Sequence, residues 1–383
     1  MEPARQARVL IVNAGSSSLK LRVLAGDDTV SGTADLPPPG GGGGRGGGRG
    51  GGGGTDTAAI KDAIASFGAV DAVGHRVVHG GTFYVAPVLV NSEVRRRLES
   101  LTDLAPLHQP KSLAALDAVT ALLPDTPAVA CFDTAFHATI GAAASTFALP
   151  AEWRARWNLR RYGFHGLSHA YASRRAAELL DRQDAAGLRV VTCHLGAGAS
   201  LAAVHSGRSV DTTMGFTPLD GLVMATRSGA VDPGLVLWLE EHARTPPAEL
   251  AATLERRSGL TGLAGTADMR EVLDRARAGD PNAVLGRDVY LHRLRALIAA
   301  MAAAMDGIDA LVFTGGVGEN SAEIRSRAAD GLGFLGVRLD DERNANPGHD
   351  DWQISPDYAA VRSFVIAARE DKQIAAEVRS VLA

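Results

Sequence analysis

The sequence predicts an α/β protein built from two related domains, and three observations support this prediction. Short β-branched runs alternate with stretches rich in Ala, Leu and Arg, a pattern typical of helices layered on sheets. A chain of 383 residues is long enough for two cores. Two segments that begin at Val9 and Val190 both read as a strand, a small-residue turn and a returning strand, with the sequences VLIVNAGSSSLKLRVL and VVTCHLGAGASLAAVHSG.

One such hairpin in each half indicates a duplicated domain that holds phosphates between the halves. Two Gly/Ser hairpins can also resemble each other by chance. The candidate strands are residues 9–13, 19–24, 69–73, 128–132, 189–194, 201–205 and 310–314. In open α/β sheets ligands bind beyond the carboxyl ends of the strands, so we expect the functional residues in the loops that follow these strands.

Composition excludes several classes of protein. The net charge of −4 and the pI near 6.3 give no support for binding nucleic acid. Cys131 and Cys193 each close an apolar run, which indicates strand ends in a reducing cytoplasm and not a disulfide framework or a metal site. The apolar run near the N-terminus is too short for a signal peptide, and the longest apolar stretch is about half of the ~20 residues that a membrane span needs. We therefore expect a cytoplasmic protein.

The segment 37–54, PPPGGGGGRGGGRGGGGG, is the most unusual part of the sequence. Its composition cannot bury apolar surface, so we interpret residues 40–54 as an inserted surface loop. Arg45 and Arg49 resemble the arginines of RGG-type nucleic-acid tails, but two arginines are few for such a tail.

Two early motifs suggest anion binding. Residues 13–20, NAGSSSLK, offer backbone N–H groups, hydroxyls and Lys20 to a phosphate, although serine-rich turns are common and this is not a Walker A loop. Residues 74–81, GHRVVHGG, follow an apolar strand and place Arg76 among glycines, which allow a ligand to come close. An arginine that simply faces solvent is the alternative.

Two further strands end in candidate functional groups. Asp133 directly follows a predicted strand, where it could act in a site or cap the next helix. Residues 193–198, CHLGAG, form either a phosphate-binding turn or a plain tight turn.

Long polar loops complete the set. Residues 161–169 and 211–229 are rich in Gly and polar groups, and such loops inside a domain are usually functional. His165 and His169 are spaced like zinc ligands on a helix, but no third ligand is evident. Residues 315–320, GGVGEN, fit a nucleotide-binding turn at the start of a helix.

Taken in this order, the motifs closely resemble those of the acetate kinase family, part of the acetate and sugar kinase, Hsp70 and actin superfamily. The segments that carry the resemblance span residues 9–371 and are NAGSSSLK, GHRVVHGG, LAPLHQP, FDTAFH, RYGFHGLSH, HLGAGAS, DTTMGFTPLDGL, FTGGVGENS and ARED. The resemblance implies duplicated actin-like, ribonuclease H-like domains with a cleft between them. The implied domains are residues 1–138 with 372–383, and a nucleotide-binding domain of residues 139–371, with the C-terminal helix packing back on the first domain.

The resemblance also implies roles for individual residues. Asn13 and Glu370 would hold Mg²⁺, or Mn²⁺ in its place. The catalytic group would be Asp133, His165, Arg227 and Arg76, and His165 would stabilise the transition state. The methyl pocket would be lined by Val78, Leu107, Phe164 and Pro218, next to Arg76. The nucleotide would contact Lys20, His194, Leu195, Gly196, Ala197, Gly198, Asp268, Met269, Arg270, Gly316, Val317, Gly318, Glu319 and Asn320.

Three positions and the Gly-rich insertion depart from the family's pattern. The family usually has Asn where Ala197 stands, and this change removes a donor beside the nucleotide phosphates. It usually has Asn where Gln109 stands. It also has an acid where Ala230 stands, and this loss could alter the orientation of the neighbouring Arg227.

The implied reaction is the reversible, Mg-dependent, direct in-line transfer of the γ-phosphoryl group of ATP to acetate, giving acetyl phosphate and ADP, in a homodimer that binds neither nucleic acid nor membrane. Acetate is already ionised at neutral pH, so no general base is needed. Asp133 should therefore orient Arg76 or the water shell of the metal. The alternatives are a propionate or butyrate kinase with the same fold, or an ATP-driven chaperone-like protein, for which the motifs leave no peptide-binding domain.

Deleting residues 40–53 should leave kcat within about twofold, because the cost of closing a loop changes slowly with its length. The measurement is steady-state kinetics of the deletion variant, with circular dichroism to show that it folds. A large loss of activity in a folded variant would identify the insertion as a functional element.

Overall fold

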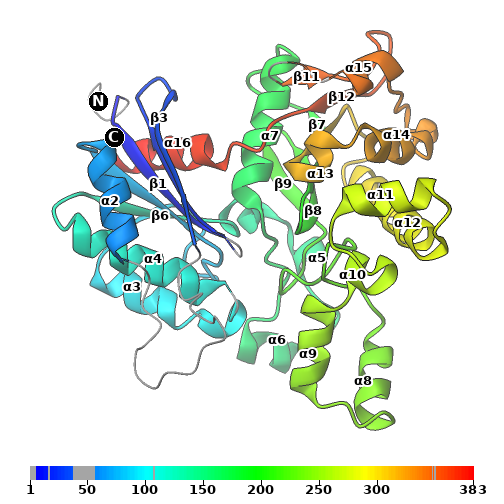
Figure 1. Ribbon diagram of the computed structural model, residues 1–383, viewed down its shortest axis with the longest axis horizontal. Coiled ribbons are helices and arrows are strands. Elements are labelled where there is room, and N and C mark those ends of the chain that lie inside the picture. The colour runs from blue at the N-terminus through cyan, green and yellow to red at the C-terminus, as the bar shows by residue number, and fades with distance from the viewer. Residues whose placement is uncertain (1–5, 16–17, 38–56, 107, 347, 349–350) are drawn as a thin grey trace. The chain divides into compact units, whose positions relative to one another are not determined.

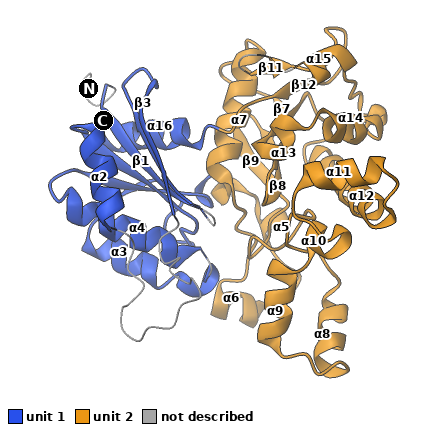
Figure 2. Cartoon of the chain, in the orientation of Figure 1, with its two compact units in different colours: residues 1–136, 369–383 blue, residues 137–368 orange. Residues whose placement is uncertain are grey.

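A computed structural model describes residues 6–15, 18–37, 57–106, 108–346, 348 and 351–383 of the chain (Figure 1). The residues divide into two compact units (Figure 2). Unit 1 contains residues 1–136 and 369–383, and unit 2 contains residues 137–368. The predicted Gly-rich loop of residues 40–54 lies outside the described residues.

Unit 1 contains one mixed six-stranded sheet in the order β3-β2-β1-β4-β6-β5. The first three strands form an antiparallel meander, β4 and β6 run parallel to β1, and β5 is an antiparallel edge. The strands are β1 (Val9–Ala14), β2 (Leu19–Leu24), β3 (Val30–Leu36), β4 (Ala72–Val77), β5 (Val88–Leu89) and β6 (Ala128–Phe132).

Helices cover both faces of this sheet. α2 and α4 pack on one face, where Leu10, Val12 and Val73 join their apolar side chains in a core. α16 packs on the other face, where a Cβ on Gly74 would lie 2.5 Å from Cγ2 of Ile374, so only glycine lets this helix approach. The C-terminal helix thus packs on the sheet of unit 1. The helices are α2 (Thr57–Phe67), α3 (Ser92–Glu99), α4 (Gln109–Leu122) and α16 (Glu370–Leu382), with a 3-10 turn over Thr102–Leu104.

Unit 2 repeats the same sheet. Its order β9-β8-β7-β10-β12-β11 has the same pattern of parallel and antiparallel neighbours, so β7 corresponds to β1 and β10 to β4. The predicted α/β class with a duplicated domain is thus confirmed. The strands are β7 (Arg189–Leu195), β8 (Ala199–His205), β9 (Arg208–Thr212), β10 (Ala310–Thr314), β11 (Trp352–Gln353) and β12 (Arg362–Val365).

The sheet of unit 2 is also covered on both faces, by α7 and by α12. Asp280 caps α12 by accepting from two backbone N–H groups, and Pro281 follows at a position that needs no N–H donor. Among the described residues no helix combines the length and apolarity needed to cross a membrane. The helices are α5 (Ala142–Ser145), α6 (Ala151–Trp157), α7 (Gly166–Leu179), α8 (Pro233–Glu241), α9 (Pro247–Arg256), α10 (Gly259–Ala264), α11 (Met269–Arg277), α12 (Pro281–Ala303), α13 (Gly315–Asn320), α14 (Ala322–Asp330) and α15 (Asp341–Ala345), with 3-10 turns over Ala135–Thr139 and Gly333–Leu335.

Three sequence predictions of local structure are wrong. The strand expected at residues 69–73 is β4, which starts three residues later because the Asp71 carboxylate and the Ala69 carbonyl both accept hydrogen bonds from Arg8. The motif at residue 74 therefore lies largely in a strand. The loop expected at 161–169 ends inside α7, which begins at Gly166, and the loop expected at 211–229 starts inside β9.

His75 is a buried histidine on the α4 face of β4, and neither ring nitrogen has a hydrogen-bond partner in the described structure. Burial lowers its pKa to about 4, although the charge of Asp117 opposes this shift. Below pH 6.5, the ordinary pKa of a histidine, His75 takes up a proton in the unfolded chain but stays neutral in the folded chain. The stability that depends on neutral His75 is therefore present above about pH 6.5 and is lost as the pH falls towards 4.

His75→Leu should flatten the acid limb of the stability curve of unit 1. Each pH unit between about 6.5 and 4 costs the wild type roughly 1.4 kcal/mol through this group, or about 3 kcal/mol in all. Urea unfolding followed by circular dichroism at several pH values measures the slope. Equal slopes in the variant and the wild type would show that His75 is not held neutral by burial.

Candidate functional site

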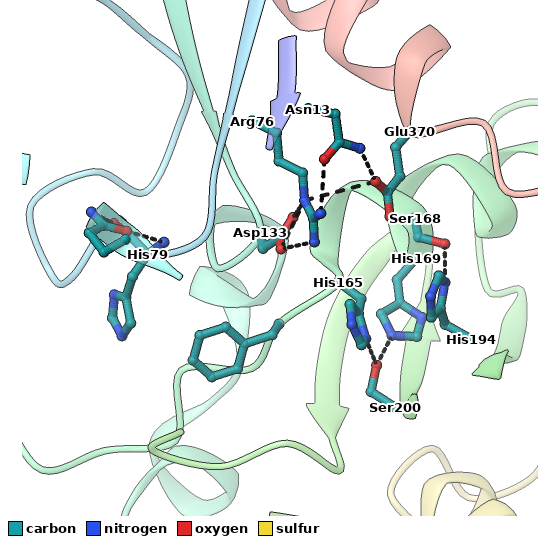
Figure 3. Close-up of polar contacts among 12 residues, drawn as sticks. Asn13, Arg76, His79, Asp133, His165, Ser168, His169, His194, Ser200 and Glu370 are labelled. Carbon is teal, nitrogen blue, oxygen red and sulfur yellow. Dashed lines mark hydrogen bonds and ion pairs between the residues drawn. The ribbon is translucent and has the colours of Figure 1, made fainter. Parts of the chain in front are cut away.

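The carboxyl end of the unit 1 sheet brings four of the predicted residues together (Figure 3). Side chains alternate between the faces of a strand, so Asn13 at the end of β1 and Arg76 near the end of β4 both point to the α16 face. Asp133 directly follows β6, and Glu370 is the first residue of α16. The fold therefore gathers side chains from four separate parts of the sequence.

Arg76 is the centre of this cluster. Its Nη2 and Nε donate to the Asp133 carboxylate at 2.6 Å and 3.0 Å, and its Nη1 donates to Asn13 Oδ1 at 3.0 Å. Asn13 Nδ2 donates to Glu370 Oε2 at 3.0 Å, and that oxygen lies 3.8 Å from Arg76 Nε. The guanidinium is thus fixed in one orientation by partners on two sides.

Burial and charge act against each other in this cluster. Burial alone would lower the pKa of Arg76, but the charges of Asp133 and Glu370 outweigh it and raise that pKa above its ordinary value. Burial raises the pKa of Asp133, Arg76 opposes the shift, and Glu370 adds to it. Removing one member would leave a buried charge without its partner, which is why the set acts as a unit.

The segment after β4 is braced from α4. Gln109 is fully buried, its Oε1 accepts from the backbone of His79 at 3.3 Å, and its Nε2 donates to the carbonyls of His79 and Leu98 at 3.2 Å each. Gln109, the residue that departs from the family's Asn, therefore ties the segment 77–81 to the start of α4.

In unit 2, His165 occupies the N-cap of α7 in a left-handed conformation, with φ 57° and ψ 24°. Non-glycine residues rarely adopt this conformation, and it is enriched at functional sites. The nearby Gly163 has φ 73°, and a Cβ there would lie 2.6 Å from both His137 and Thr212. The turn 163–166 thus depends on close backbone packing that presents the His165 ring.

Hydroxyl groups hold the histidines of this site (Figure 3). His165 Nδ1 lies 2.9 Å from Ser200 Oγ, and the His165 ring stacks on His194 with centroids 4.4 Å apart. His194 Nδ1 lies 2.8 Å from Ser168 Oγ. Both nitrogens of His169 contact hydroxyls, so the zinc alternative for His165 and His169 has no geometric support in the described residues.

Arg227 is positioned next to His165. Its Nε lies 3.2 Å from Glu255 Oε2 in α9, and its Nη1 donates to the Pro218 carbonyl at 3.2 Å. A Cβ on Gly198 would lie 3.4 Å from Arg227 Nη1 and 3.4 Å from His165 Nε2. The glycine therefore leaves a small space bordered by a guanidinium and an imidazole, which suits an anion. Glu255 supplies an acidic partner for Arg227 although Ala230 has lost the acid of the family's pattern.

A cavity of ≈ 630 Å³ lies within unit 2, which is a typical volume for a small-molecule site. Several predicted nucleotide contacts line it, namely Gly196, Ala197, Asp268, Met269, Arg270, Gly316, Val317 and Asn320. The lining continues over α11, α12 and α14 with Leu273, Asp274, Arg277, Tyr290, Ser321 and Glu323. Ala197 presents only a methyl group to this cavity.

The other predicted nucleotide contacts lie outside this lining, and Glu319 has a clear local role. Glu319 Oε1 accepts from the backbone N–H groups of Gly315 and Ala368 at 2.9 Å each, so the carboxylate holds two chain segments together. Lys20 pairs with Asn13 in the β1–β2 register and is exposed. His194 and Leu195 end β7, Gly198 directly precedes β8, and Gly318 lies in α13.

The predicted methyl-pocket residues are distributed over both units. Val78 lies in unit 1 and is buried, Phe164 and Pro218 lie in unit 2 and are buried, and Leu107 lies outside the described residues.

Sequence reasoning missed three residues that hold the site. Glu255 lies at the end of an ordinary amphipathic helix, where nothing marks it as a partner of Arg227. Thr192 and Ser200 lie in strands β7 and β8, where a hydroxyl on a buried face was a signal that could have been followed.

Comparison with known sequences points to the same family as the motifs. A family model described as the acetokinase family matches residues 56–376. Acetate kinase of Nostoc punctiforme is 47% identical over 314 residues, which cover 82% of this chain and 77% of that protein. Acetate kinase of Shouchella clausii is 40% identical over 388 residues, which cover 96% of this chain and 98% of that protein.

Solved structures agree with this result. The crystal structure of Porphyromonas gingivalis acetate kinase has a TM-score of 0.86 and 33% identity, and the match covers 98% of this chain and 100% of that one. A propionate kinase from Francisella tularensis also has a TM-score of 0.86 and 33% identity, with 97% and 98% covered. The resemblance of the motifs is confirmed, and the chain belongs to the acetokinase family.

Proposed function

We propose that this protein transfers the γ-phosphoryl group of ATP to the carboxylate of acetate, giving acetyl phosphate and ADP, and catalyses the reverse reaction, by direct in-line transfer. The observation that carries the proposal is the 40% identity with an acetate kinase over nearly the full length of both chains. The site geometry supports the proposal independently, because Arg76 in unit 1 and Arg227 in unit 2 are cations held in fixed orientations.

The main obstacle to the reaction is repulsion between two anions. Acetate is ionised at neutral pH, so it needs no base, and catalysis of phosphoryl transfer depends on positioning and on electrostatic stabilisation. Arg76 and Arg227 are each held by a carboxylate and by a neutral acceptor. We assign both guanidinium groups to the acetate and phosphoryl oxygens, and His165 to the transferred group.

Asp133 has a positioning role in this proposal. Its carboxylate holds two nitrogens of Arg76, and only 1% of the residue is exposed. A carboxylate engaged in this way keeps the guanidinium in place and does not need to accept a proton from the acid. A positioning role for Asp133 is consistent with the reaction, because acetate is already ionised and needs no general base.

ATP is the nucleotide that the family implies, and we propose the cavity of unit 2 as its site. The lining combines the glycine-rich turns at residues 196 and 316 with apolar side chains such as Leu260 and Met269. Backbone N–H groups of such turns suit phosphates, and apolar side chains suit a base. Asp268 caps α11 and binds Arg270 through both carboxylate oxygens, which positions these two residues at the cavity.

We propose that Asn13 and Glu370 hold Mg²⁺, or Mn²⁺ in its place. Asn13 Nδ2 donates to Glu370 Oε2 at 3.0 Å, so the two side chains lie together at the carboxyl end of β1. Each carries a side-chain oxygen, and Mg²⁺ usually takes one or two carboxylates while phosphates and water complete its shell. The donor set therefore fits. When bound, the ion would neutralise phosphate charge, while Arg76 keeps the Asn13 amide oriented through Oδ1.

A propionate kinase is a second candidate, because the Francisella tularensis propionate kinase has the same TM-score as the acetate kinase structure. An added methylene group in an apolar pocket changes discrimination by about 10- to 200-fold. Val78 and Pro218 are the residues that we expect to limit the length of the acid.

The proposal includes a homodimer in the cytoplasm. α8 has no buried residue, although Leu235, Leu237 and Trp238 are 48%, 63% and 53% exposed. A helix that is apolar on all sides needs a partner surface, and a second copy of the chain would supply one. The buried free thiols of Cys131 and Cys193 suit a reducing compartment.

The test of the activity is a hydroxamate assay with ATP, Mg²⁺ and acetate, in which hydroxylamine traps acetyl phosphate. We expect kcat/KM to be highest for acetate and to fall for propionate and then butyrate. A higher value for propionate would favour the second candidate, and no product with any of the three acids would reject the proposal.

Arg227→Ala should lower kcat by roughly two to four orders of magnitude with little change in the KM for acetate. Its charge is needed most when charge is shared between the attacking and leaving oxygens, a contact worth about 3 to 5 kcal/mol. Arg76→Ala should also raise the KM for acetate, because Val78 of the same segment contributes to the acid pocket. Steady-state kinetics, with circular dichroism as the folding control, separates the two. An effect of Arg227→Ala on KM alone would refute the role assigned to it.

Trp238→Arg should convert the dimer to a monomer, because it places a charge in the apolar contact. Sedimentation velocity measures the change, and Tyr358→Arg is the matched control, since Tyr358 is 82% exposed but lies outside α8. A dimer that survives in the Trp238 variant would place the interface elsewhere.

A further inference from the structure

A chain of hydrogen bonds runs from the interior of unit 2 to the His165 ring, and Figure 3 shows its outer part, from His169 through Ser200 to His165. Thr192 Oγ1 lies 2.7 Å from His169 Nδ1, His169 Nε2 lies 2.7 Å from Ser200 Oγ, and Ser200 Oγ lies 2.9 Å from His165 Nδ1. The register of β7 and β8 explains this alignment. His194 pairs with Ser200 and Thr192 pairs with Ala202, and paired residues share a face of the sheet, so the hydroxyls of Thr192 and Ser200 both point to the α7 face. Thr192, His169 and Ser200 are all fully buried.

The protons in this chain can be arranged in two directions. In the outward direction, Thr192 donates to His169 Nδ1, His169 Nε2–H donates to Ser200, and Ser200 donates to His165 Nδ1. In the inward direction every bond is reversed, so His165 Nδ1–H donates to Ser200 and His169 Nδ1–H donates to Thr192. His169 carries one ring proton in either arrangement, because burial, together with His137 and His194, keeps its pKa well below the ordinary value.

The Thr192 hydroxyl distinguishes the two directions. In the described structure its one hydrogen-bond partner is His169. The outward direction uses the hydroxyl proton in that bond, whereas the inward direction leaves this proton buried without an acceptor, which costs free energy. The outward direction is therefore favoured, and in it His165 Nδ1 accepts a hydrogen bond and cannot carry a proton.

The surroundings of His165 favour the same state. His194 of β7 stacks on the ring at 4.4 Å, Arg227 borders the same space above Gly198, and His169 meets His137 edge to face at 5.6 Å. A cation on His165 would lie beside the guanidinium of Arg227 and against a second imidazole. Like charges this close disfavour the protonated form.

We propose that His165 acts as a neutral imidazole whose proton is held on Nε2 by the chain Thr192–His169–Ser200, so that it donates a hydrogen bond to the transferred phosphoryl group instead of supplying positive charge. This inference rests on the proposed function for the identity of the acceptor. Ser200, His169 and Thr192 are positioning residues, and the positive charge of unit 2 at this point comes from Arg227.

The direct test is ¹⁵N NMR of the protein labelled at histidine, which distinguishes protonated from unprotonated ring nitrogens. We expect an unprotonated Nδ1 and a protonated Nε2 on His165 at neutral pH, with the signals assigned by their loss in His165→Gln. A protonated Nδ1 near pH 7, whether in the cation or in the other neutral tautomer, would overturn the proposal.

Two variants test the inner end of the chain. Thr192→Val keeps the shape of the side chain but removes the hydroxyl, so the outward and inward arrangements of protons become similar in free energy. The pKa of His165 should then rise by about one pH unit, which corresponds to the free energy of one hydrogen bond. Thr192→Ser keeps the hydroxyl and should leave that pKa unchanged. An unchanged pKa in folded Thr192→Val would overturn the proposal.

These readouts do not depend on turnover. A failed hydroxamate assay would reject the proposed function and leave the tautomer of His165 as measured. An active enzyme whose His165 carries a proton on Nδ1 would reject this inference and leave the proposed function intact. If Thr192→Val does not fold, the tautomer measured in the wild-type protein still decides the question.

Discussion

The site in unit 1 depends on the packing of Gly74 against α16. Because side chains alternate along β4, the residue that faces α16 at position 74 fixes which face Arg76 occupies two residues later. A shift of one residue in the register would turn Arg76 to the face of α2 and α4 and separate it from Asp133 and Glu370. Packing in the core thus determines the chemistry at the edge of the sheet.

In unit 2 the alternation of side chains along a strand likewise determines which residues reach the site. β7 corresponds to β1, and its alternation places Thr192 and His194 on the α7 face in the way that β1 places Ile11 and Asn13 on the α16 face. In unit 1 this face carries Arg76 of β4 between carboxylates, and in unit 2 the corresponding face carries imidazoles between hydroxyls. One repeated sheet therefore supports a cluster of charged groups in one copy and a cluster of imidazoles and hydroxyls in the other.

The sequence predicted where each motif lies better than it predicted which residues of different segments contact one another. The α/β class, the duplicated hairpin and the ends of β1 and β6 followed from periodicity and from glycine. The bond between Arg76 and Asp133 joins residues 57 apart, and the contact of Arg227 with Glu255 depends on where α9 returns. The strands β3 and β9 were missed because their residues are largely polar and partly exposed, so they lack the apolar run on which the prediction relied. Gln109 likewise looked like a departure from a pattern, and only its three hydrogen bonds show that it braces the segment after β4.

The return of α16 to unit 1 has a consequence for synthesis on the ribosome. Unit 2 is continuous in sequence, whereas unit 1 needs residues 369–383 to cover the face of β4 that Gly74 leaves open. While those residues remain in the exit tunnel, the emerging sheet of unit 1 exposes an apolar surface and Arg76 lacks Glu370. The sheet of unit 1 should therefore be completed only after unit 2 has been synthesised, and the bonds between Arg76, Asn13 and Glu370 should form only once α16 has left the tunnel.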